Sequence, residues 1–150
     1  MKTKILMVCL GNICRSPLAE GILKSKIDSK KIHIESAGTG DWHIGQLPDK
    51  RSVKIAKEHG LDITDQRGRQ FNTADFDKFD MIFVMDNSNY NDVMALARNK
   101  EDQKKVHLIL NEVFPEENLD VPDPYMGGES GFKRVYDMLD QATDKIVERL

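Results

Sequence analysis

The sequence has few cysteines and lacks any long apolar run. Its 150 residues include two cysteines, Cys9 and Cys14, too few for a disulfide framework. The apolar run at residues 5–10 is too short for a membrane span or for the core of a secretion signal. We therefore expect a cytoplasmic protein with no membrane partner. Two thiols in such a reducing compartment favour a chemical role over a structural one.

The chain also lacks an excess of positive charge, because its 25 acidic residues outnumber its 22 Lys and Arg residues. The net charge of −3 argues against a nucleic-acid partner, because nucleic-acid binding depends on a positive field. It leaves room for a small anionic substrate, since one local site can be positive on an acidic protein. We find no repeat, no low-complexity segment and no linker. The length then predicts one domain over residues 1–150.

Apolar segments alternate between two patterns along the chain. Short runs of β-forming residues predict strands, and apolar residues at helical spacing predict helices. This alternation predicts an α/β fold, with a parallel sheet covered by helices on both faces. The expected strands are 4–8, 32–36, 81–85 and 106–110; the expected helices are 17–27, 48–59, 75–79, 87–98 and 131–150. Ligands in such folds bind beyond the carboxyl ends of the strands, where the loop Cys9–Ser16 lies.

The loop Cys9–Ser16 has the composition of an anion-binding ring. Its length allows successive backbone amides to point at one centre. Gly11 and Asn12 tolerate the left-handed backbone angles that a tight ring requires. Pro17 fits the first turn of the following helix, whose positive dipole end faces the same centre. The loop is not the nucleotide-binding type, because no Lys precedes Ser16.

Three side chains of this loop suggest covalent chemistry on phosphate. Arg15 carries a planar fork that can hold two phosphate oxygens. Cys9 would lie beneath the anion, where the helix end and the cation lower a thiol pKa from ~8.5 to ~3.5–7.5. Ser16 can donate a hydrogen bond to the thiolate, which would then attack phosphorus. The competing interpretation is a buried structural cysteine beside a helix cap.

Phosphoryl transfer also requires an acid for the leaving group, and Asp123 is the best candidate. Pro122 and Pro124 flank it and stiffen the loop that would hold the carboxylate over the site. An Asp-Pro pair also commonly starts a turn. The sequence leaves both interpretations of Asp123 open.

Four segments, VCLGNICRSPLAE, ESAGTGDW, VMDNSN and DPY, together resemble the low-molecular-weight protein-tyrosine phosphatase family. The resemblance spans nearly the whole chain, in order. It implies a four-stranded parallel sheet and a hydrolase that needs no metal or other cofactor. It also implies that Cys9 is the nucleophile, that Arg15 holds the phosphate, and that Asp123 acts first as acid and then as base.

The resemblance implies further site residues. Asn12, Ser16 and Ser36 match residues that hold the loop in shape. Trp42 and Tyr125 resemble the aromatic walls of the family's substrate cleft, although exposed aromatic residues are also common elsewhere. The full substrate-binding set is Leu10, Gly11, Asn12, Ile13, Cys14, Ser16, Trp42 and Tyr125.

Three residues bear on how closely the chain follows the family. Gln66 stands where many members carry a His that supports the loop, and Gln can still form hydrogen bonds. Ile13 stands where members resembling protein-arginine phosphatases carry Thr. The apolar Ile side chain lacks the Thr hydroxyl, and it therefore favours aryl phosphates as substrates. Cys14 either packs as a small residue or closes a reversible disulfide with Cys9 under oxidation.

Several alternative functions share this sequence pattern. Arsenate reduction on this fold needs further cysteines, which the chain lacks. A protein-arginine phosphatase is a second alternative, and a non-catalytic phosphate-binding module is a third. His43 and His59 lack the spacing of a metal-ligand pair, and we expect them at the surface or behind the site. The expected partners are phosphotyrosine proteins, with inorganic phosphate or vanadate as inhibitory anions.

Overall fold

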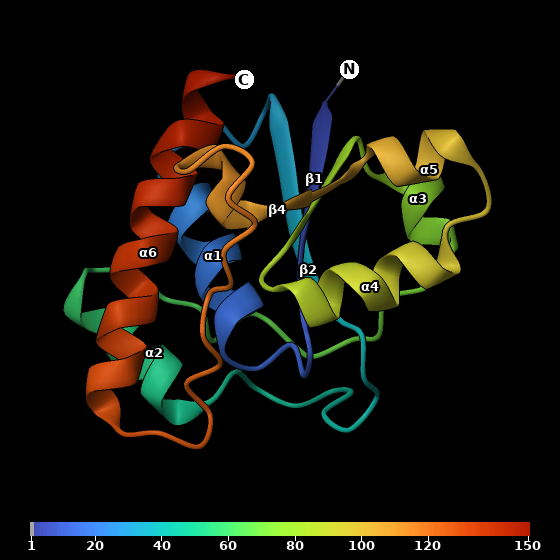
Figure 1. Cartoon of the computed structure of the whole chain (residues 1–150). Coiled ribbons are helices and arrows are strands. Elements are labelled where there is room, and N and C mark those ends of the chain that lie inside the picture. The colour runs from blue at the N-terminus through green and yellow to red at the C-terminus, as the bar shows by residue number, and fades with distance from the viewer. Residues whose placement is uncertain (1) are drawn as a thin grey trace.

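The apolar segments predicted as strands pair in one parallel sheet. The computed structural model describes residues 2–150, and within them the sheet has four strands in the order β2-β1-β3-β4 (Figure 1). Their bounds are β1 (Thr3–Cys9), β2 (Ile32–Gly38), β3 (Met81–Val84) and β4 (Val106–Leu108). The predicted α/β fold with a four-stranded parallel sheet is confirmed.

Helices cover both faces of this sheet, as Figure 1 shows. On one face lie α1 (Arg15–Lys24), α2 (Lys50–Glu58) and α6 (Glu129–Glu148). On the other lie α3 (Ala74–Lys78), α4 (Asn87–Leu96) and α5 (Lys100–Lys104). A short 3-10 helix, η1 (Ile109–Glu112), follows β4. No helix in residues 2–150 has the length and apolar character needed to cross a bilayer.

The alternation of side chains along β1 divides the core into two layers. Ile5, Met7 and Cys9 face α1, α2 and α6, whereas Leu6 and Val8 face the opposite helices. All five are almost fully buried. A central strand buried on both faces explains why its sequence is continuously apolar rather than alternating. The nucleophile candidate Cys9 is thus part of the core and is fixed by its packing.

Local hydrogen bonds shift several element boundaries from those expected. Helix α2 begins after Pro48, because the Asp49 side chain accepts a hydrogen bond from the Arg51 amide and so caps the helix. Strand β4 ends at Leu108, and residues 109 and 110 belong to η1 instead. Helix α5 was not expected, because a helix of five residues shows no apolar periodicity.

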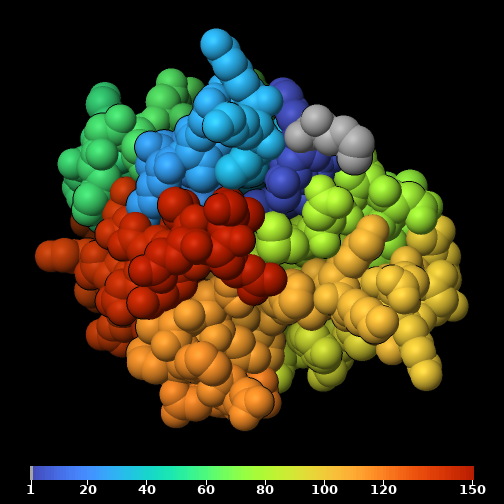
Figure 2. Space-filling model, turned by 90° about the horizontal axis from the view of Figure 1, so that it is seen from above, coloured from blue at the N-terminus to red at the C-terminus, as the bar shows by residue number. Residues whose placement is uncertain are grey.

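Strand order places the site at a switch point of the sheet. The chain passes from β1 outward to β2, whereas β3 continues outward to β4 on the other side. The loops after β1 and β3 therefore diverge and leave a crevice at the carboxyl edge. Figure 2 looks onto the opposite end of the molecule, where α6 (red) lies between the α1 region (blue) and the segment after β4 (orange).

Candidate active site

The Cys9–Ser16 loop starts at the last residue of β1 and runs into the first turn of α1. The two residues that follow β2 hold its first half. The backbone amides of Thr39 and Gly40 donate to the carbonyls of Cys9 and Leu10, each at 2.9 Å. The loop is therefore attached to two adjacent strands of the sheet.

Two residues explain how the chain turns so tightly here. Asn12 adopts a left-handed backbone with φ of 58°. Gly11 does not, so our expectation of a left-handed angle at Gly11 was wrong. Its lack of a side chain serves another purpose, since a Cβ there would lie 3.0 Å from Cδ2 of His43. A Cβ on Gly38 would lie 2.7 Å from the Leu10 carbonyl oxygen, so only glycine allows β2 to run this close to the loop.

The Cys9 sulfur is buried and faces two hydrogen-bond donors. Ser16 Oγ lies 3.0 Å from it, and the Asn12 amide donates to it at 3.3 Å. The side-chain amide of Asn12 donates to Ser16 Oγ at 2.8 Å, so the hydroxyl proton is directed elsewhere. The nearest acceptor for that proton is the sulfur, because the Ala37 carbonyl lies farther away, at 3.4 Å. Both donors would stabilise a thiolate more than a thiol.

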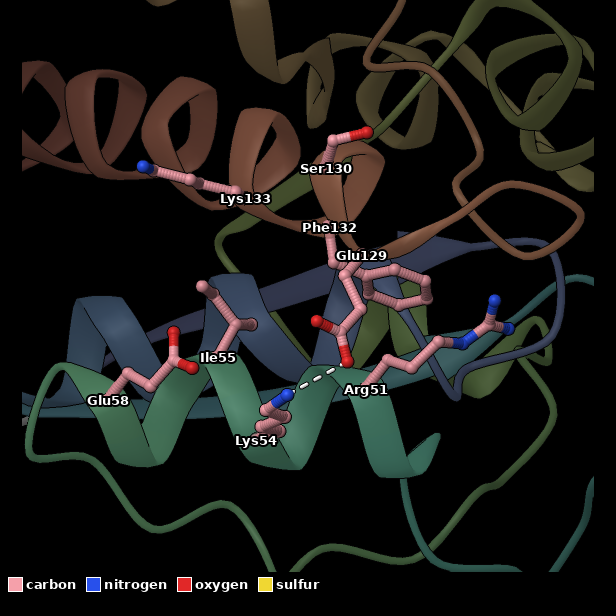
Figure 3. A pocket seen from close by; sticks show the side chains of 8 residues that line it. All are labelled: Arg51, Lys54, Ile55, Glu58, Glu129, Ser130, Phe132 and Lys133. Atoms are coloured by element: carbon pink, nitrogen blue, oxygen red, sulfur yellow. Dashed lines mark hydrogen bonds and ion pairs between the residues drawn. The ribbon is translucent and has the colours of Figure 1, made fainter.

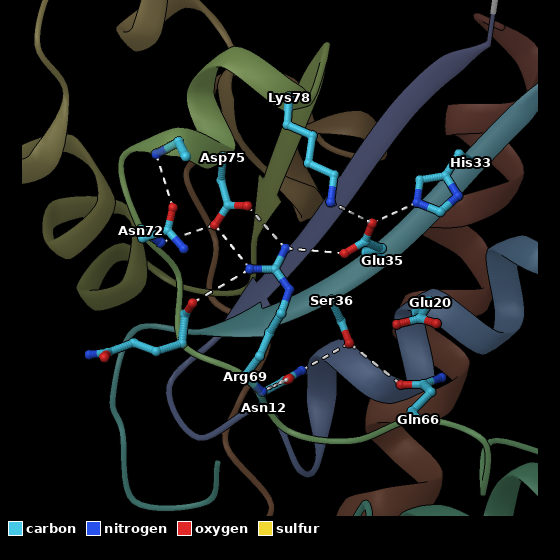
Figure 4. Close-up of polar contacts among 12 residues, drawn as sticks. Asn12, Glu20, His33, Glu35, Ser36, Gln66, Arg69, Asn72, Asp75 and Lys78 are labelled. Carbon is cyan, nitrogen blue, oxygen red and sulfur yellow. Dashed lines mark hydrogen bonds and ion pairs between the residues drawn. The ribbon is translucent and has the colours of Figure 1, made fainter. Parts of the chain in front are cut away.

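The Asn12 side chain connects the loop to two neighbouring segments (Figure 4). Its Nδ2 donates to Ser16 Oγ at 2.8 Å and to Ser36 Oγ at 2.9 Å. Its Oδ1 accepts from the Arg69 backbone amide at 3.0 Å. The Arg69 guanidinium in turn donates to both oxygens of Asp75, at 3.0 and 3.1 Å. All polar atoms of the Asn12 amide group therefore have partners.

Gln66 continues this network, where the family resemblance implied a His. Its Nε2 donates to the Pro17 carbonyl at 3.0 Å, and its Oε1 accepts from Ser36 Oγ at 3.5 Å. The side chain is buried. An amide at this position thus supports both the first turn of α1 and the hydroxyl that binds Asn12.

Arg15 is the largest of the fully buried polar side chains, with 2% of its surface exposed. Its Nη1 donates to Asp86 Oδ2 at 2.6 Å and to the Val121 carbonyl at 2.9 Å. Burial lowers the pKa of Arg15, but the Cys9 sulfur and Asp86 outweigh burial and raise it above its ordinary value. The guanidinium is therefore a fixed cation beside the sulfur.

Asp86 is a site residue that our sequence analysis missed. It lies two positions after the end of β3 and caps α4, where its Oδ1 accepts from the Asn89 amide at 2.7 Å. The available signal was an Asp at the carboxyl end of a buried strand, within the segment VMDNSN. That signal did not reveal its partner, because Arg15 lies 71 positions away in the sequence.

Asp123 lies at the edge of the site. Its Oδ1 accepts from the Tyr125 amide at 3.0 Å, which is the contact of a turn-forming Asp. Its Oδ2 lies 3.7 Å from Nη2 of Arg15, and 43% of the side chain is exposed. The two interpretations that the sequence left open are therefore compatible, because one oxygen forms the turn and the other faces the site.

These side chains surround one cleft that opens to solvent. Trp42 and Tyr125 lie at its rim, and both are substantially exposed. His43 also lines it, so it lies at the site itself. Asn12 and Ser16 lie behind the loop and do not contribute to the lining. The lining residues are Cys9, Leu10, Gly11, Ile13, Cys14, Arg15, Trp42, His43, Asp123 and Tyr125.

Ile13 and Cys14 pack on Phe132 of α6 beneath the cleft. Burial, together with the negative charge of Asp49, raises the pKa of the Cys14 thiol far above its ordinary value. Cys14 is thus a neutral thiol. Both cysteines are free, and the disulfide between them stays a prediction.

Comparison with known proteins assigns the chain to a family. A family model described as low molecular weight phosphotyrosine protein phosphatase matches residues 4–150. The chain belongs to this family. The family assignment from the four sequence segments is confirmed, and with it the assignment to the protein-tyrosine phosphatases, which are hydrolases of phosphoric monoesters.

Relatives of this phosphatase family match over nearly their whole lengths. The low molecular weight phosphotyrosine protein phosphatase of Schizosaccharomyces pombe is 38% identical over 89% of this chain and 87% of its own. A protein tyrosine phosphatase structure from Entamoeba histolytica has a TM-score of 0.92, with 38% identity, 99% of this chain and 96% of that chain covered. A Drosophila arginine phosphatase structure has a TM-score of 0.89 and is 33% identical. The match covers 99% of this chain and 97% of that one.

The two structural relatives are named for different activities, yet they resemble this chain almost equally. The fold therefore does not distinguish a tyrosine from an arginine phosphatase. Specificity depends on individual side chains in the cleft. Within residues 2–150, no group of three or more His, Cys, Asp or Glu side chains is arranged to hold a metal ion.

Proposed function

We propose that this chain, acting as one catalytic domain, hydrolyses phosphotyrosine and other aryl phosphate monoesters through a cysteinyl-phosphate intermediate. One observation carries the proposal. A buried sulfur, a buried guanidinium and an exposed carboxylate line the same cleft, although Cys9 and Asp123 are far apart in the sequence. A nucleophile, a cation for the phosphate oxygens and a proton donor are the groups that this reaction requires.

In the first step, the Cys9 thiolate attacks phosphorus while the bond between phosphorus and the leaving oxygen breaks. Protonated Asp123 donates its proton to that oxygen, and the phenol departs. Arg15 and the loop amides hold the equatorial oxygens, where negative charge is concentrated in the transition state. The site provides these charges in advance, because Asp86 and Val121 fix the guanidinium.

In the second step, water attacks the phosphorus of the cysteinyl phosphate. Asp123, now a carboxylate, accepts a proton from this water, and the bond between phosphorus and sulfur breaks. Inorganic phosphate is released, and the Cys9 thiolate is restored. The Asn12 amide donates to this sulfur and Ser16 Oγ lies 3.0 Å from it, so both can stabilise it as the leaving thiolate.

The rim favours a flat, extended substrate. Trp42 and Tyr125 expose aromatic surface next to the cleft, and an aryl ring can lie between such walls. Phosphotyrosine is long enough to reach a sulfur at the bottom of a cleft, whereas phosphoserine is short. Inorganic phosphate and vanadate should compete with substrate, because both resemble the transferred group.

The test is p-nitrophenyl phosphate turnover in the presence of a chelator. We expect turnover to persist with chelator, to fall at least about 10⁴-fold in Cys9→Ser, and to fall about 10²–10⁴-fold in Asp123→Ala. Trapping of radiolabelled phosphate on the parent protein, but not on Cys9→Ser, would identify the intermediate. A rate that disappears with chelator would contradict a mechanism based on these side chains alone.

The similarity to an arginine phosphatase structure calls for a direct comparison of substrates. Ile13 lines the cleft and packs on Phe132, so its side chain presents an apolar surface without a hydroxyl. We expect kcat/KM for a phosphotyrosine peptide to exceed that for a phosphoarginine peptide by more than about 10²-fold. Equal values would favour the arginine phosphatase instead.

A further inference from the structure

The segment that carries Asp123, residues 122–128, has few attachments to the rest of the protein. Within it, the Tyr125 amide donates to Asp123 and the Gly127 amide donates to the Pro124 carbonyl at 3.0 Å. One backbone bond joins it to the first turn of α6. Among residues 2–150, its other hydrogen bonds to the rest of the protein all come from one side chain, Arg51 of α2. Asp123 itself also pairs with Arg15 Nη2 at 3.7 Å, so its position depends on Arg15 directly and on Arg51 through the segment that carries it.

Arg51 holds this segment with two parallel bonds. Its Nη1 donates to the Gly127 carbonyl and its Nη2 to the Tyr125 carbonyl, both at 2.8 Å. The same guanidinium donates to both oxygens of Asp49, each at 3.1 Å. Its carbon lies 4.5 Å from the centre of the Phe132 ring, and Figure 3 shows the two side chains next to each other. All these contacts require a planar fork, which Lys does not have.

The same turn of α2 also holds the Cys9–Ser16 loop. The Asp49 amide donates to the Ile13 carbonyl at 2.7 Å, and the Ser52 hydroxyl donates to the Cys14 carbonyl at 3.2 Å. Residues 49–52 therefore bind the nucleophile loop through one pair of contacts and the acid segment through another. These two parts of the site are separated by more than a hundred positions in the sequence, and the first turn of α2 contacts both.

We propose that Arg51 is a positioning residue that sets the distance between Asp123 and the reacting oxygen. The inference rests on the proposed role of Asp123 as the acid. Misplacement of a catalytic group by about 1 Å can cost 10²-fold in rate. Loss of Arg51 should therefore weaken proton donation to the leaving group while nucleophilic attack by Cys9 continues.

The experiment compares two substrates that differ in their need for a proton. Phenolate is a poor leaving group that requires protonation, whereas p-nitrophenolate leaves more readily without it. In Arg51→Gln we expect kcat/KM for phenyl phosphate to fall about 10-fold to 10²-fold, and for p-nitrophenyl phosphate to fall less than about threefold. Arg51→Lys should show the same selectivity, because it restores charge without the fork.

Lys54→Gln is the matched control. Lys54 lies one turn further along α2, and its side chain pairs with Glu129 of α6 at 2.8 Å rather than with the carbonyls that Arg51 holds (Figure 3). We expect both substrates to be turned over within about twofold of the parent rate, since exposed ion pairs contribute little. Thermal unfolding of each variant shows whether it is folded, and if Arg51→Gln does not fold, Arg51→Lys decides the question.

Asp123→Asn separates failure of the inference from failure of the proposed function. If Asp123→Asn is selective against phenyl phosphate but the Arg51 variants slow both substrates equally or neither, Arg51 does not position the acid. If Asp123→Asn slows both substrates equally, Asp123 is not the acid, and the proposed function fails together with the inference. Selectivity in both sets of variants supports the role of Arg51.

Discussion

The floor and the rim of the cleft are held in different ways. The floor, residues 9–16, is buried almost throughout, and its side chains form hydrogen bonds with Ser36 of β2 and with Asp86, just beyond β3. The rim consists of Trp42, Asp123 and Tyr125, which are exposed and have few contacts. A rigid floor fixes the sulfur and the cation. A sparsely attached rim lets a protein-borne phosphotyrosine enter and leave.

This difference indicates where mutations should affect folding and where they should affect only catalysis. Changes to the floor disturb buried hydrogen bonds, which are costly to leave unpaired. Changes to the rim remove exposed groups, which contribute little to stability. The following variants test whether the two regions behave as differently as their structures suggest.

Asn12→Ala should show the largest combined effect. It removes an amide that holds three partners and places a Cβ-bearing residue at φ of 58° without the local hydrogen bonds of Asn. We expect the free energy of unfolding to fall by about 2–3 kcal/mol and kcat/KM to fall about 10²-fold. Urea unfolding and p-nitrophenyl phosphate kinetics measure the two quantities.

Asn12→Gly separates the two causes, because glycine tolerates the backbone angle but has no amide. It should recover part of the stability and none of the activity. Full recovery of activity would show that the backbone angle at Asn12 matters and that its side-chain hydrogen bonds do not.

Asp86→Asn should have the next largest effect. The amide keeps an acceptor for Arg15 but removes the charge from a hydrogen bond of 2.6 Å. We expect KM for p-nitrophenyl phosphate to rise about tenfold and the free energy of unfolding to fall by about 1–2 kcal/mol. Asp120→Asn is the control. Asp120 is an exposed carboxylate near the same sheet edge, and it accepts a hydrogen bond from Asn87 rather than from Arg15. Equal effects of the two substitutions would contradict a specific role for Asp86.

Trp42→Ala should have a smaller effect, confined to substrate binding. The side chain is 64% exposed, so the free energy of unfolding should change by less than about 0.5 kcal/mol. We expect KM for aryl phosphates to rise about threefold and KM for an aliphatic phosphate monoester to stay unchanged. An equal rise for both substrates would show that Trp42 does not bind the aryl ring.

Glu20→Gln should have the smallest effect, and one that depends on pH. Glu20 is buried close to Ser36 and Gln66 (Figure 4), and burial raises its pKa even though Lys24 lowers it. A carboxyl with a raised folded pKa stabilises the protein at low pH, and this contribution disappears as pH rises through the folded value.

The stability of Glu20→Gln relative to the parent should therefore improve as pH rises from about 4 towards 7. Urea unfolding at several pH values measures this difference. A constant difference would show that Glu20 titrates alike in the folded and unfolded chains. Glu35 serves as a comparison, because its pKa is lowered by hydrogen bonds from His33 and Lys78 despite partial burial. Its contribution should be present at neutral pH and lost in acid.

The sequence alone determined the fold class and the location of the site. Apolar periodicity predicted each strand, and the spacing of Cys9, Arg15 and Ser16 placed an anion loop between the first strand and helix. These signals are local, because each element is specified by residues within about ten positions of one another. Glycine at position 11 was recognised for the wrong reason, since its role depends on His43, which is distant in sequence.

Only the tertiary structure decided which distant side chains support the loop. Asp86 contacts Arg15 because parallel strands bring their carboxyl ends to one edge of the sheet. Arg51 contacts residues 122–128 because α2 packs beside the start of α6. No pattern along the chain encodes such pairs. Hydrogen bonding depends on distances of about 3 Å, and those distances are set by packing between elements rather than by spacing in the sequence.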